Sequence, residues 1–288
     1  MSEPARLRVG VIGVGRAGSV LAAALQRAGH HVVAVHAHSG RSRQRAAGML
    51  PDAAVVSPPD VFAAADLVLL TVPDDVLLTM VQAAAAGGWA GREQFVVHSS
   101  GRYGVTELDP LHAQPMALHP VMTLTGRPED VDRLIGCPFG VTAPEHLMTV
   151  AAALVVEMGG EPMFVAEDKR PLYHAALAHS ANHMITLVAE AMDLLRLSGL
   201  DEPHRMLGPL LDAALANALA HGDNALTGPV SRGDSGTVAA HLDELTKVST
   251  AMADAYRALA RRTADRALAA GNLDPALAAR LLEVLAQR

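Results

Sequence analysis

The sequence predicts an α/β protein in which a doubly wound parallel sheet is followed by an all-α domain. Three observations carry this prediction. The first half alternates short apolar runs with helical patterns, the second half shows only helical spacing, and 288 residues make about two domains. Strands that alternate with helices indicate βαβ units and therefore parallel pairing. The change of character near residue 166 predicts an N-terminal domain at 1–165 and a C-terminal domain at 166–288.

Each element of the first half has its own local signal. Short apolar runs predict strands at 7–12, 31–35, 66–72, 95–98, 116–118, 139–142 and 162–165. Helical spacing predicts helices at 16–28 and 41–49.

The second half contains helical patterns separated by Gly, Pro and Asn. Pro171 stands where a helix can begin, and Gly199 stands where it can stop. The predicted helices cover 171–197, 203–221, 236–270 and a short segment after a turn at 272–274.

Composition excludes several classes of protein. Aromatic residues make up only 3% and the net charge is −7, which argues against a nucleic-acid partner. The single cysteine, Cys137, forms no internal disulfide and fits a reducing compartment, so a cytoplasmic protein is expected. No apolar run reaches the roughly 18 residues of a membrane span, so no membrane partner is expected.

A glycine motif directly follows the first predicted strand. Gly13, Gly15 and Gly18 have the G-x-G-x-x-G spacing and open a helix. In dinucleotide-binding proteins these glycines permit a tight turn, a close approach to the pyrophosphate and close packing of helix on strand. The whole loop, with Val14, Arg16 and Ala17, is therefore a candidate cofactor site, and the alternative is a purely structural glycine turn.

The residues after the second strand favour NADPH over NADH. NAD binders place an acidic residue about 20 residues beyond the loop, yet no Asp or Glu occurs between Glu3 and Asp52. Ser39 and Arg41 stand in this region and can bind a 2′-phosphate. The alternative is that an arginine-rich composition merely scatters Arg over solvated helix faces.

Beyond the strand at 66–72, Val72, Pro73 and Asp74 are expected to form the rim of the nicotinamide site. The alternative is an ordinary turn in which Asp74 or Asp75 caps the next helix.

Several polar residues are candidates for contact with a small-molecule substrate. Ser99 and Ser100 follow a strand whose carboxyl end should face the ligand. His119 and His174 are candidate proton donors, since histidine titrates near neutral pH. Asn182 lies on the same helical face as His174 and could bind substrate or nicotinamide. For His119 and Asn182 the alternative is a structural side chain with a local partner.

The loop at 225–234 interrupts the helical half. Arg232 on this loop could clamp a substrate carboxylate with two hydrogen bonds. Alternatively, Arg232 and Asp234 form a surface pair that stabilises the turn. The sequence contains no C-x-x-C or H-E-x-x-H motif, and no metal site is predicted.

Taken together, these motifs resemble one family. The glycine loop, the segments 98–101 and 119–120, Tyr173-His174 with Asn182, and the segments 226–229 and 232–234 are similar to bacterial proteins in which a Rossmann-like domain is followed by a domain of unknown function (DUF2520). These belong to the superfamily of 6-phosphogluconate, β-hydroxyacid and ketopantoate dehydrogenases. The resemblance implies an NADPH-dependent reductase of a small 2-oxo acid, with ketopantoate as substrate and a homodimer formed through the helical domain.

The resemblance has one departure. The superfamily often places a catalytic Lys four residues before the Asn, and here that position is Ala178. His119 or His174 is then expected to replace the lysine as the acid. The missing lysine also keeps two alternatives open, a nucleotide-binding sensor without turnover and a dehydrogenase of another small hydroxy acid.

Overall fold

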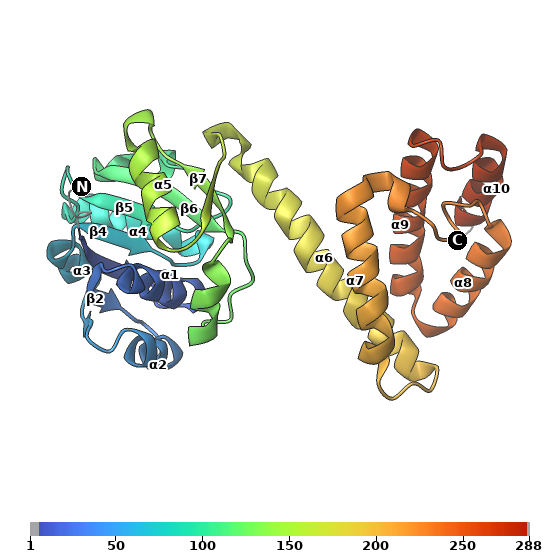
Figure 1. Cartoon of the computed structure of the whole chain (residues 1–288), viewed down its shortest axis with the longest axis horizontal. Coiled ribbons are helices and arrows are strands. Elements are labelled where there is room, and N and C mark those ends of the chain that lie inside the picture. The colour runs from blue at the N-terminus through green and yellow to red at the C-terminus, as the bar shows by residue number, and fades with distance from the viewer. Residues whose placement is uncertain (1–5, 287–288) are drawn as a thin grey trace. The chain divides into compact units, whose positions relative to one another are not determined.

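The computed structural model describes residues 6–286, and the chain divides into two compact units, Met1–Ala181 and Asn182–Arg288. The first unit is an α/β domain and the second is entirely helical. Figure 1 shows both, with the chain coloured from blue to red. The predicted fold class is confirmed.

The first unit is built on one sheet of eight strands in the order β3-β2-β1-β4-β5-β6-β7-β8. The strands are β1 (Arg8–Ile12), β2 (His31–His36), β3 (Ala54–Val55), β4 (Leu67–Leu70), β5 (Phe95–His98), β6 (Gln114–Pro120), β7 (Pro138–Thr142) and β8 (Glu161–Phe164). All neighbours are parallel except β6 and β7, which run antiparallel. The sheet is therefore predominantly parallel, as predicted, with one antiparallel pair that the sequence did not indicate.

Helices cover both faces of the sheet. They are α1 (Arg16–Arg27), α2 (Gly40–Met49), α3 (Pro58–Ala64), α4 (Asp74–Gly87) and α5 (Met148–Glu157), with short 3₁₀ turns η1 (Thr106–Leu111), η2 (Pro128–Leu134), η3 (Glu145–Leu147) and η4 (Glu167–Lys169). Successive side chains of a strand point to opposite faces. In β4, Leu67 and Leu69 join the core that includes α1, α2 and α5, whereas Val68 and Leu70 join the core that includes α3 and α4.

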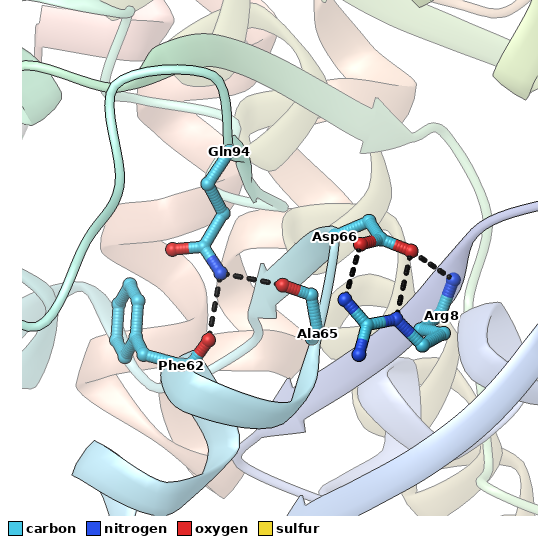
Figure 2. A network of polar contacts seen from close by, with 5 residues as sticks. All are labelled: Arg8, Phe62, Ala65, Asp66 and Gln94. Carbon is cyan, nitrogen blue, oxygen red and sulfur yellow. Dashed lines mark hydrogen bonds and ion pairs between the residues drawn. The ribbon is translucent and has the colours of Figure 1, made fainter.

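The amino ends of the central strands are held by the polar network of Figure 2. The Asp66 carboxylate accepts hydrogen bonds from the backbone N–H of Arg8 at 2.9 Å and from its guanidinium at 2.6 and 3.1 Å. These bonds lower the pKa of Asp66, and the bond from the Arg8 side chain has the largest effect. The Gln94 amide donates to the carbonyl oxygens of Phe62 and Ala65 at 2.8 and 2.7 Å, which satisfies the end of α3. This end of the sheet is therefore structural, and the opposite end is open to function.

The second unit has its core among its last three helices. Its elements are α6 (Arg170–Leu197), which begins in the first unit, α7 (Pro203–His221), η5 (Gly222–Ala225), α8 (Ser235–Val248), α9 (Thr250–Ala269) and α10 (Pro275–Ala286). Val238, Ala264 and Leu281 are among the buried residues of this core. By contrast, the described residues of α6 and α7 that are buried are Arg170 and Pro203 alone.

The single helix predicted at 236–270 is wrong, because the chain breaks there into α8 and α9. Ser249 lies between them in an extended conformation, with φ −162° and ψ 120°, and its hydroxyl accepts a hydrogen bond from the N–H of Met252. A serine that caps a helix start competes with continuing the preceding helix. Within the described residues, no helix is long and apolar enough to cross a membrane.

Candidate functional site

The glycine loop lies at the carboxyl end of β1, beside the place where strand order reverses between β1 and β4. Gly13 has φ +97°, and a Cβ there would lie 2.8 Å from the carbonyl oxygen of Thr71. A Cβ on Gly18 would collide with the Thr71 hydroxyl and the Gly13 carbonyl oxygen. The Thr71 hydroxyl already donates to that carbonyl at 2.7 Å. The first and third glycines are therefore required by the fold itself.

Gly15 differs from the other two glycines. Its φ is −81°, and a Cβ built there would meet only the Gly13 carbonyl oxygen, at 4.0 Å. Gly15 is also the N-cap of α1, a helix without a side-chain cap and without an acidic residue in its first turn. Free N–H groups at a helix start attract anions. The loop thus fits a pyrophosphate, and the open space at Gly15 is the observation that the fold does not explain.

The side chains between the glycines have different surroundings. Val14 is fully buried and Ala17 packs against the first core, so only their backbones could contact a cofactor. Arg16 is exposed, and no ion pair joins it to another described residue.

The end of β2 carries the groups expected at a 2′-phosphate. Ser39 caps α2, with its hydroxyl accepting from the N–H of Ser42 at 3.1 Å. The Arg43 guanidinium donates to the carbonyl oxygens of Ala37 and His38, both at 3.3 Å. In contrast, Arg41 is exposed and its guanidinium has no partner among residues 6–286. The side chain of Arg41 is therefore available to an anion, whereas that of Arg43 is already held.

After β4, Val72 and Asp74 are partly buried and Pro73 is exposed. Pro73 is the N-cap of α4, and Asp74 and Asp75 lie in its first turn. The interpretation of Asp74 or Asp75 as the capping residue is therefore wrong. The two carboxylates instead lie in the first turn, where they interact favourably with the positive end of the helix dipole.

The turn after β5 is held by a buried histidine. The His98 Nδ1 atom accepts from the N–H of Ser100 at 3.2 Å, so Nε2 carries the proton and donates to the Gly104 carbonyl oxygen at 2.6 Å. Burial above all lowers the pKa of His98 to about 4, so the ring stays neutral. The Ser100 hydroxyl oxygen accepts from the N–H groups of Arg102 and Tyr103 at 3.2 and 3.1 Å. Ser99 is partly buried beside it and donates its N–H to the Leu70 carbonyl oxygen at 3.4 Å.

Next to this turn, the structure joins His119, Tyr173 and His174 into one cluster within the first unit. The His119 Nδ1 atom lies 2.8 Å from the Tyr173 hydroxyl, and the two rings meet edge to face at 5.7 Å. His174 meets the other side of the His119 ring, with centroids 6.0 Å apart. A Cβ on Gly101 would lie 2.6 Å from the His174 ring and 2.9 Å from the His119 ring, so only glycine fits there. Two of the three predicted catalytic residues are thus adjacent.

Arg170 anchors this cluster, and the sequence interpretation missed it. The side chain is fully buried and donates to the Ser100 carbonyl oxygen at 2.5 Å, the Thr142 hydroxyl at 3.0 Å and the Gly140 carbonyl oxygen at 3.4 Å. Its Nε atom has no partner, and no carboxylate of residues 6–286 forms an ion pair with it. Its guanidinium carbon lies 5.8 Å from the Tyr173 ring centroid. The available signal was its place three residues before Tyr173, which puts both on one helical face.

This buried charge affects His119. Burial, then Arg170, then His174 lower the pKa of His119 to about 4. The imidazole is consequently neutral at neutral pH. The expectation that His119 titrates near neutral pH is therefore wrong, because its surroundings keep the ring neutral there.

Asn182 and Arg232 belong to the second unit and are described within it. Asn182 is exposed, and its carbonyl oxygen accepts a hydrogen bond from the Thr186 hydroxyl at 3.3 Å. Arg232 is exposed and donates to the Thr227 carbonyl oxygen. Asp234 instead caps α8 through Thr237, at 2.7 and 3.1 Å. Arg232 and Asp234 form no direct ion pair, but after the hydrogen bonds from Thr237 the charge of Arg232 also lowers the pKa of Asp234.

The two parts of the candidate site lie along one edge of the sheet. Because β1, β4, β5 and β6 are mutually parallel, their carboxyl ends share this edge. Three strand spacings separate β1 from β6, which is roughly 14 Å. In doubly wound sheets ligands bind at this edge, beside the reversal of strand order. Among residues 6–286 no group of three or more His, Cys, Asp or Glu side chains is placed to hold a metal ion.

Comparison with known proteins agrees with this architecture. Residues 2–120 match the model of a Rossmann-like domain, and residues 137–263 match the model of DUF2520, a domain of unknown function. No curated protein sequence matches the chain.

Solved structures with this fold span nearly the whole chain. A protein from Bacteroides fragilis, provisionally described as an NADP oxidoreductase, is 22% identical over 90% of this chain and 98% of its own, with a TM-score of 0.77. An imine reductase from a Pseudomonas species is 20% identical over 98% and 100%, with a TM-score of 0.66. A 1-pyrroline-5-carboxylate reductase from Streptococcus pyogenes is 16% identical over 91% and 98%, with a TM-score of 0.61.

At these identities the solved structures establish a shared fold. The family models go further, because they match the amino-acid sequence of each domain. The two family matches lie in the order and at the places that the motifs indicate. The chain therefore belongs to the proteins in which a Rossmann-like domain is followed by a DUF2520 domain.

Proposed function

We propose that the protein is an NADPH-dependent reductase of a small 2-oxo acid, with ketopantoate as the first candidate substrate. The observation that carries the proposal is the shared edge of the sheet, which has an anion-binding glycine loop at β1 and a polar cluster at β6. The solved relatives named as reductases support the reaction class. Ketopantoate itself comes from the family resemblance of the motifs.

The preference for NADPH rests on charge. Ser39 and the unpartnered Arg41 lie at the end of β2, and no acidic residue occurs between Glu3 and Asp52. An arginine binds a 2′-phosphate with paired, charge-assisted hydrogen bonds, whereas a carboxylate in its place would repel it. The Bacteroides fragilis relative, provisionally an NADP oxidoreductase, supports the same preference.

Each part of the chain has a role in this proposal. The loop from Gly13 to Gly18 binds the pyrophosphate through backbone N–H groups, and the segment 72–74 borders the nicotinamide. Ser99, Ser100 and Asn182 hold the substrate, and Arg232 binds its carboxylate. Bound nicotinamide would supply the hydride, while the protein positions the carbonyl and provides a proton. His119 and His174 are the candidates for that proton from the sequence.

We also propose a homodimer, supported by the apolar surface of the second unit. Large apolar side chains on α6 and α7 are exposed, among them Met184, Ile185, Leu210, Leu215 and Leu219. Large exposed apolar side chains in this number are typical of an interface, and a second copy presents the same residues. The single, buried Cys137 supports a reducing cytoplasmic location.

The test is NADPH oxidation by purified protein, followed by the loss of reduced-nicotinamide absorbance. The substrates are ketopantoate, other 2-oxo acids and a cyclic imine, each with NADPH and with NADH. Turnover of ketopantoate that is faster with NADPH supports the proposal. Turnover of a different oxo acid or of the imine corrects the substrate. Binding of NADPH without turnover of any compound would favour the nucleotide-binding sensor.

A further inference from the structure

The Tyr173 hydroxyl is hydrogen-bonded to His119 at the carboxyl end of β6 and packs against Gly140 of β7, and no sequence motif singled it out. We propose that Tyr173 protonates the substrate oxygen, that His119 returns the proton, and that Arg170 positions the tyrosine. This inference deepens the proposed function and rests on the reductase activity. It replaces the expectation that His119 is the acid.

The first argument concerns the protonation state of His119. With its pKa lowered to about 4, the imidazolium makes up only about one molecule in 10³ at pH 7. A neutral imidazole N–H is a far weaker acid than a phenol, whose ordinary pKa is about 10. Burial raises the pKa of Tyr173, so its hydroxyl keeps the proton throughout the neutral range. Of the two bonded groups, tyrosine is therefore the one with a proton to give.

The second argument concerns the charge left behind. A tyrosine that donates a proton becomes a phenolate, which needs a cation nearby. Arg170 lies 5.8 Å from the Tyr173 ring, and hydrogen bonds to Ser100, Thr142 and Gly140 hold it in place. No carboxylate among residues 6–286 neutralises it through an ion pair. Glu167, Glu107 and Asp74 act on Arg170 only through space. A cation fixed in this way stabilises a negative charge that develops beside it without reorganising.

The proton path follows from the hydrogen bond at 2.8 Å between Tyr173 and His119. The substrate carbon accepts a hydride from reduced nicotinamide, and its oxygen accepts the Tyr173 proton, so a C–H and an O–H bond form as the tyrosine O–H bond breaks. The His119 Nδ1–H then passes to the phenolate while Nε2 takes a proton from water, so the imidazole stays neutral throughout and hydroxide is released to the solvent. The sum is carbonyl, hydride and one proton going to alcohol, with the nicotinamide oxidised.

Other charged or titratable groups act on this pair and must be included in any account of its pH dependence. They come from β5, α4, α6 and the segment before β7, and comprise His98, Asp74, Arg170, His174 and Cys137.

The experiment replaces one hydroxyl in each of two matched pairs. In Tyr173→Phe we expect single-turnover hydride transfer to fall about 10²–10³-fold while NADP⁺ binds as in the wild type. Tyr256→Phe is the control, because the Tyr256 hydroxyl lies 2.9 Å from the His241 Nδ1 atom in a similar edge-to-face pair at 5.8 Å, without a buried arginine at its ring. The control variant should react at the wild-type rate.

The pH profile separates proton donation from a structural role. With Tyr173 as the acid, the wild-type rate of hydride transfer stays level from about pH 6 to pH 9, because the phenol keeps its proton there. With the His119 imidazolium as the acid, the rate falls steadily as the pH rises above about 4. A falling profile, or a Tyr173→Phe variant with wild-type activity, overturns this inference and leaves the reductase standing. A wild-type protein that reduces no carbonyl or imine overturns both.

Discussion

Gly15→Ala should separate the binding function of the glycine loop from its folding function. The backbone at Gly15 is one that alanine can adopt, and its Cβ would lie no closer than 4.0 Å to the nearest atom, the Gly13 carbonyl oxygen. The second glycine of this motif is the one at which the backbone approaches a pyrophosphate. The substitution should therefore weaken nucleotide binding without unfolding the protein.

The expected free energies follow from the position of Gly15. Replacing glycine stabilises the chain by about 0.4–1 kcal/mol, because it removes freedom from the unfolded state. Losing a glycine N-cap costs about 0.5–1 kcal/mol. The two effects nearly cancel, so the free energy of unfolding should change by less than about 1 kcal/mol. A methyl group against the pyrophosphate should cost more than about 1.4 kcal/mol of binding, which is a tenfold rise in Kd.

Gly18→Ala is the contrasting variant. Its Cβ would collide with the Thr71 hydroxyl and with the Gly13 carbonyl oxygen. Overpacking costs about 1–3 kcal/mol, and losing the hydrogen bond from Thr71 to Gly13 costs about 0.5–1.5 kcal/mol. We therefore expect about 2–4 kcal/mol of destabilisation.

The assay pairs urea denaturation with calorimetric titration of NADP⁺ for both variants and the wild type. Gly48→Ala is the control for nucleotide binding, because a Cβ at Gly48 in α2 meets nothing within 4 Å; it should raise the free energy of unfolding by about 0.5–1 kcal/mol and leave NADP⁺ binding unchanged. If Gly15→Ala bound NADP⁺ as tightly as the wild type, the pyrophosphate would not lie on this loop. If Gly15→Ala unfolded like Gly18→Ala, the glycine would be explained by the fold alone.

Three further predictions test other parts of the molecule. Arg41→Ala should weaken NADP⁺ binding about 10–100-fold and leave NAD⁺ binding unchanged, measured by titration, whereas Arg43→Ala should do less because its guanidinium already bonds two carbonyl oxygens. Burial alone would raise the pKa of the Asp130 carboxyl, but hydrogen bonds from Thr125 and from the N–H groups after it outweigh burial, and the pKa is lowered. The ionised carboxylate therefore stabilises the folded protein at neutral pH, and this stabilisation is lost as the pH falls below the ordinary pKa of 3.8. Urea denaturation at about pH 7 and pH 3 should show a smaller change for Asp130→Asn than for the wild type. Leu210→Glu, on the exposed face of α7, should convert the proposed dimer to a monomer in light scattering, and an unchanged mass would place the interface elsewhere.

Much of the fold was predictable because its signals are local. The strand at 95–98 and the helix at 203–221 were predicted with the bounds that the structure has, since each has a continuous apolar pattern between clear stop signals. The antiparallel pairing of β6 and β7 was missed because direction depends on which strand lies alongside, which an apolar run leaves open. The break between α8 and α9 was missed because Ser249 has no glycine or proline beside it.

The candidate site was predictable only in part, for a similar reason. The glycine motif has a fixed spacing along the chain, so Gly13, Gly15 and Gly18 could be recognised directly. The contact between His119 and Tyr173 joins residues 54 positions apart, and no spacing rule connects them. The sequence indicated the segments that contain His119 and Tyr173, but it did not show that the Tyr173 hydroxyl is hydrogen-bonded to His119.

The role of Arg170 shows why residue type alone was misleading about the acid. Of two adjacent cations at the start of α6, Lys169 is exposed and pairs with Asp168 at 2.6 Å, whereas Arg170 is buried without a carboxylate partner. Burial of a charge is costly unless something compensates it, and here three neutral oxygens do so only partly. The same charge helps keep His119 neutral and would stabilise a Tyr173 phenolate beside it. One buried arginine therefore argues against His119 as the acid and for Tyr173, and in the proposed reaction a proton reaches the substrate without the lysine that the family resemblance leads us to expect at Ala178.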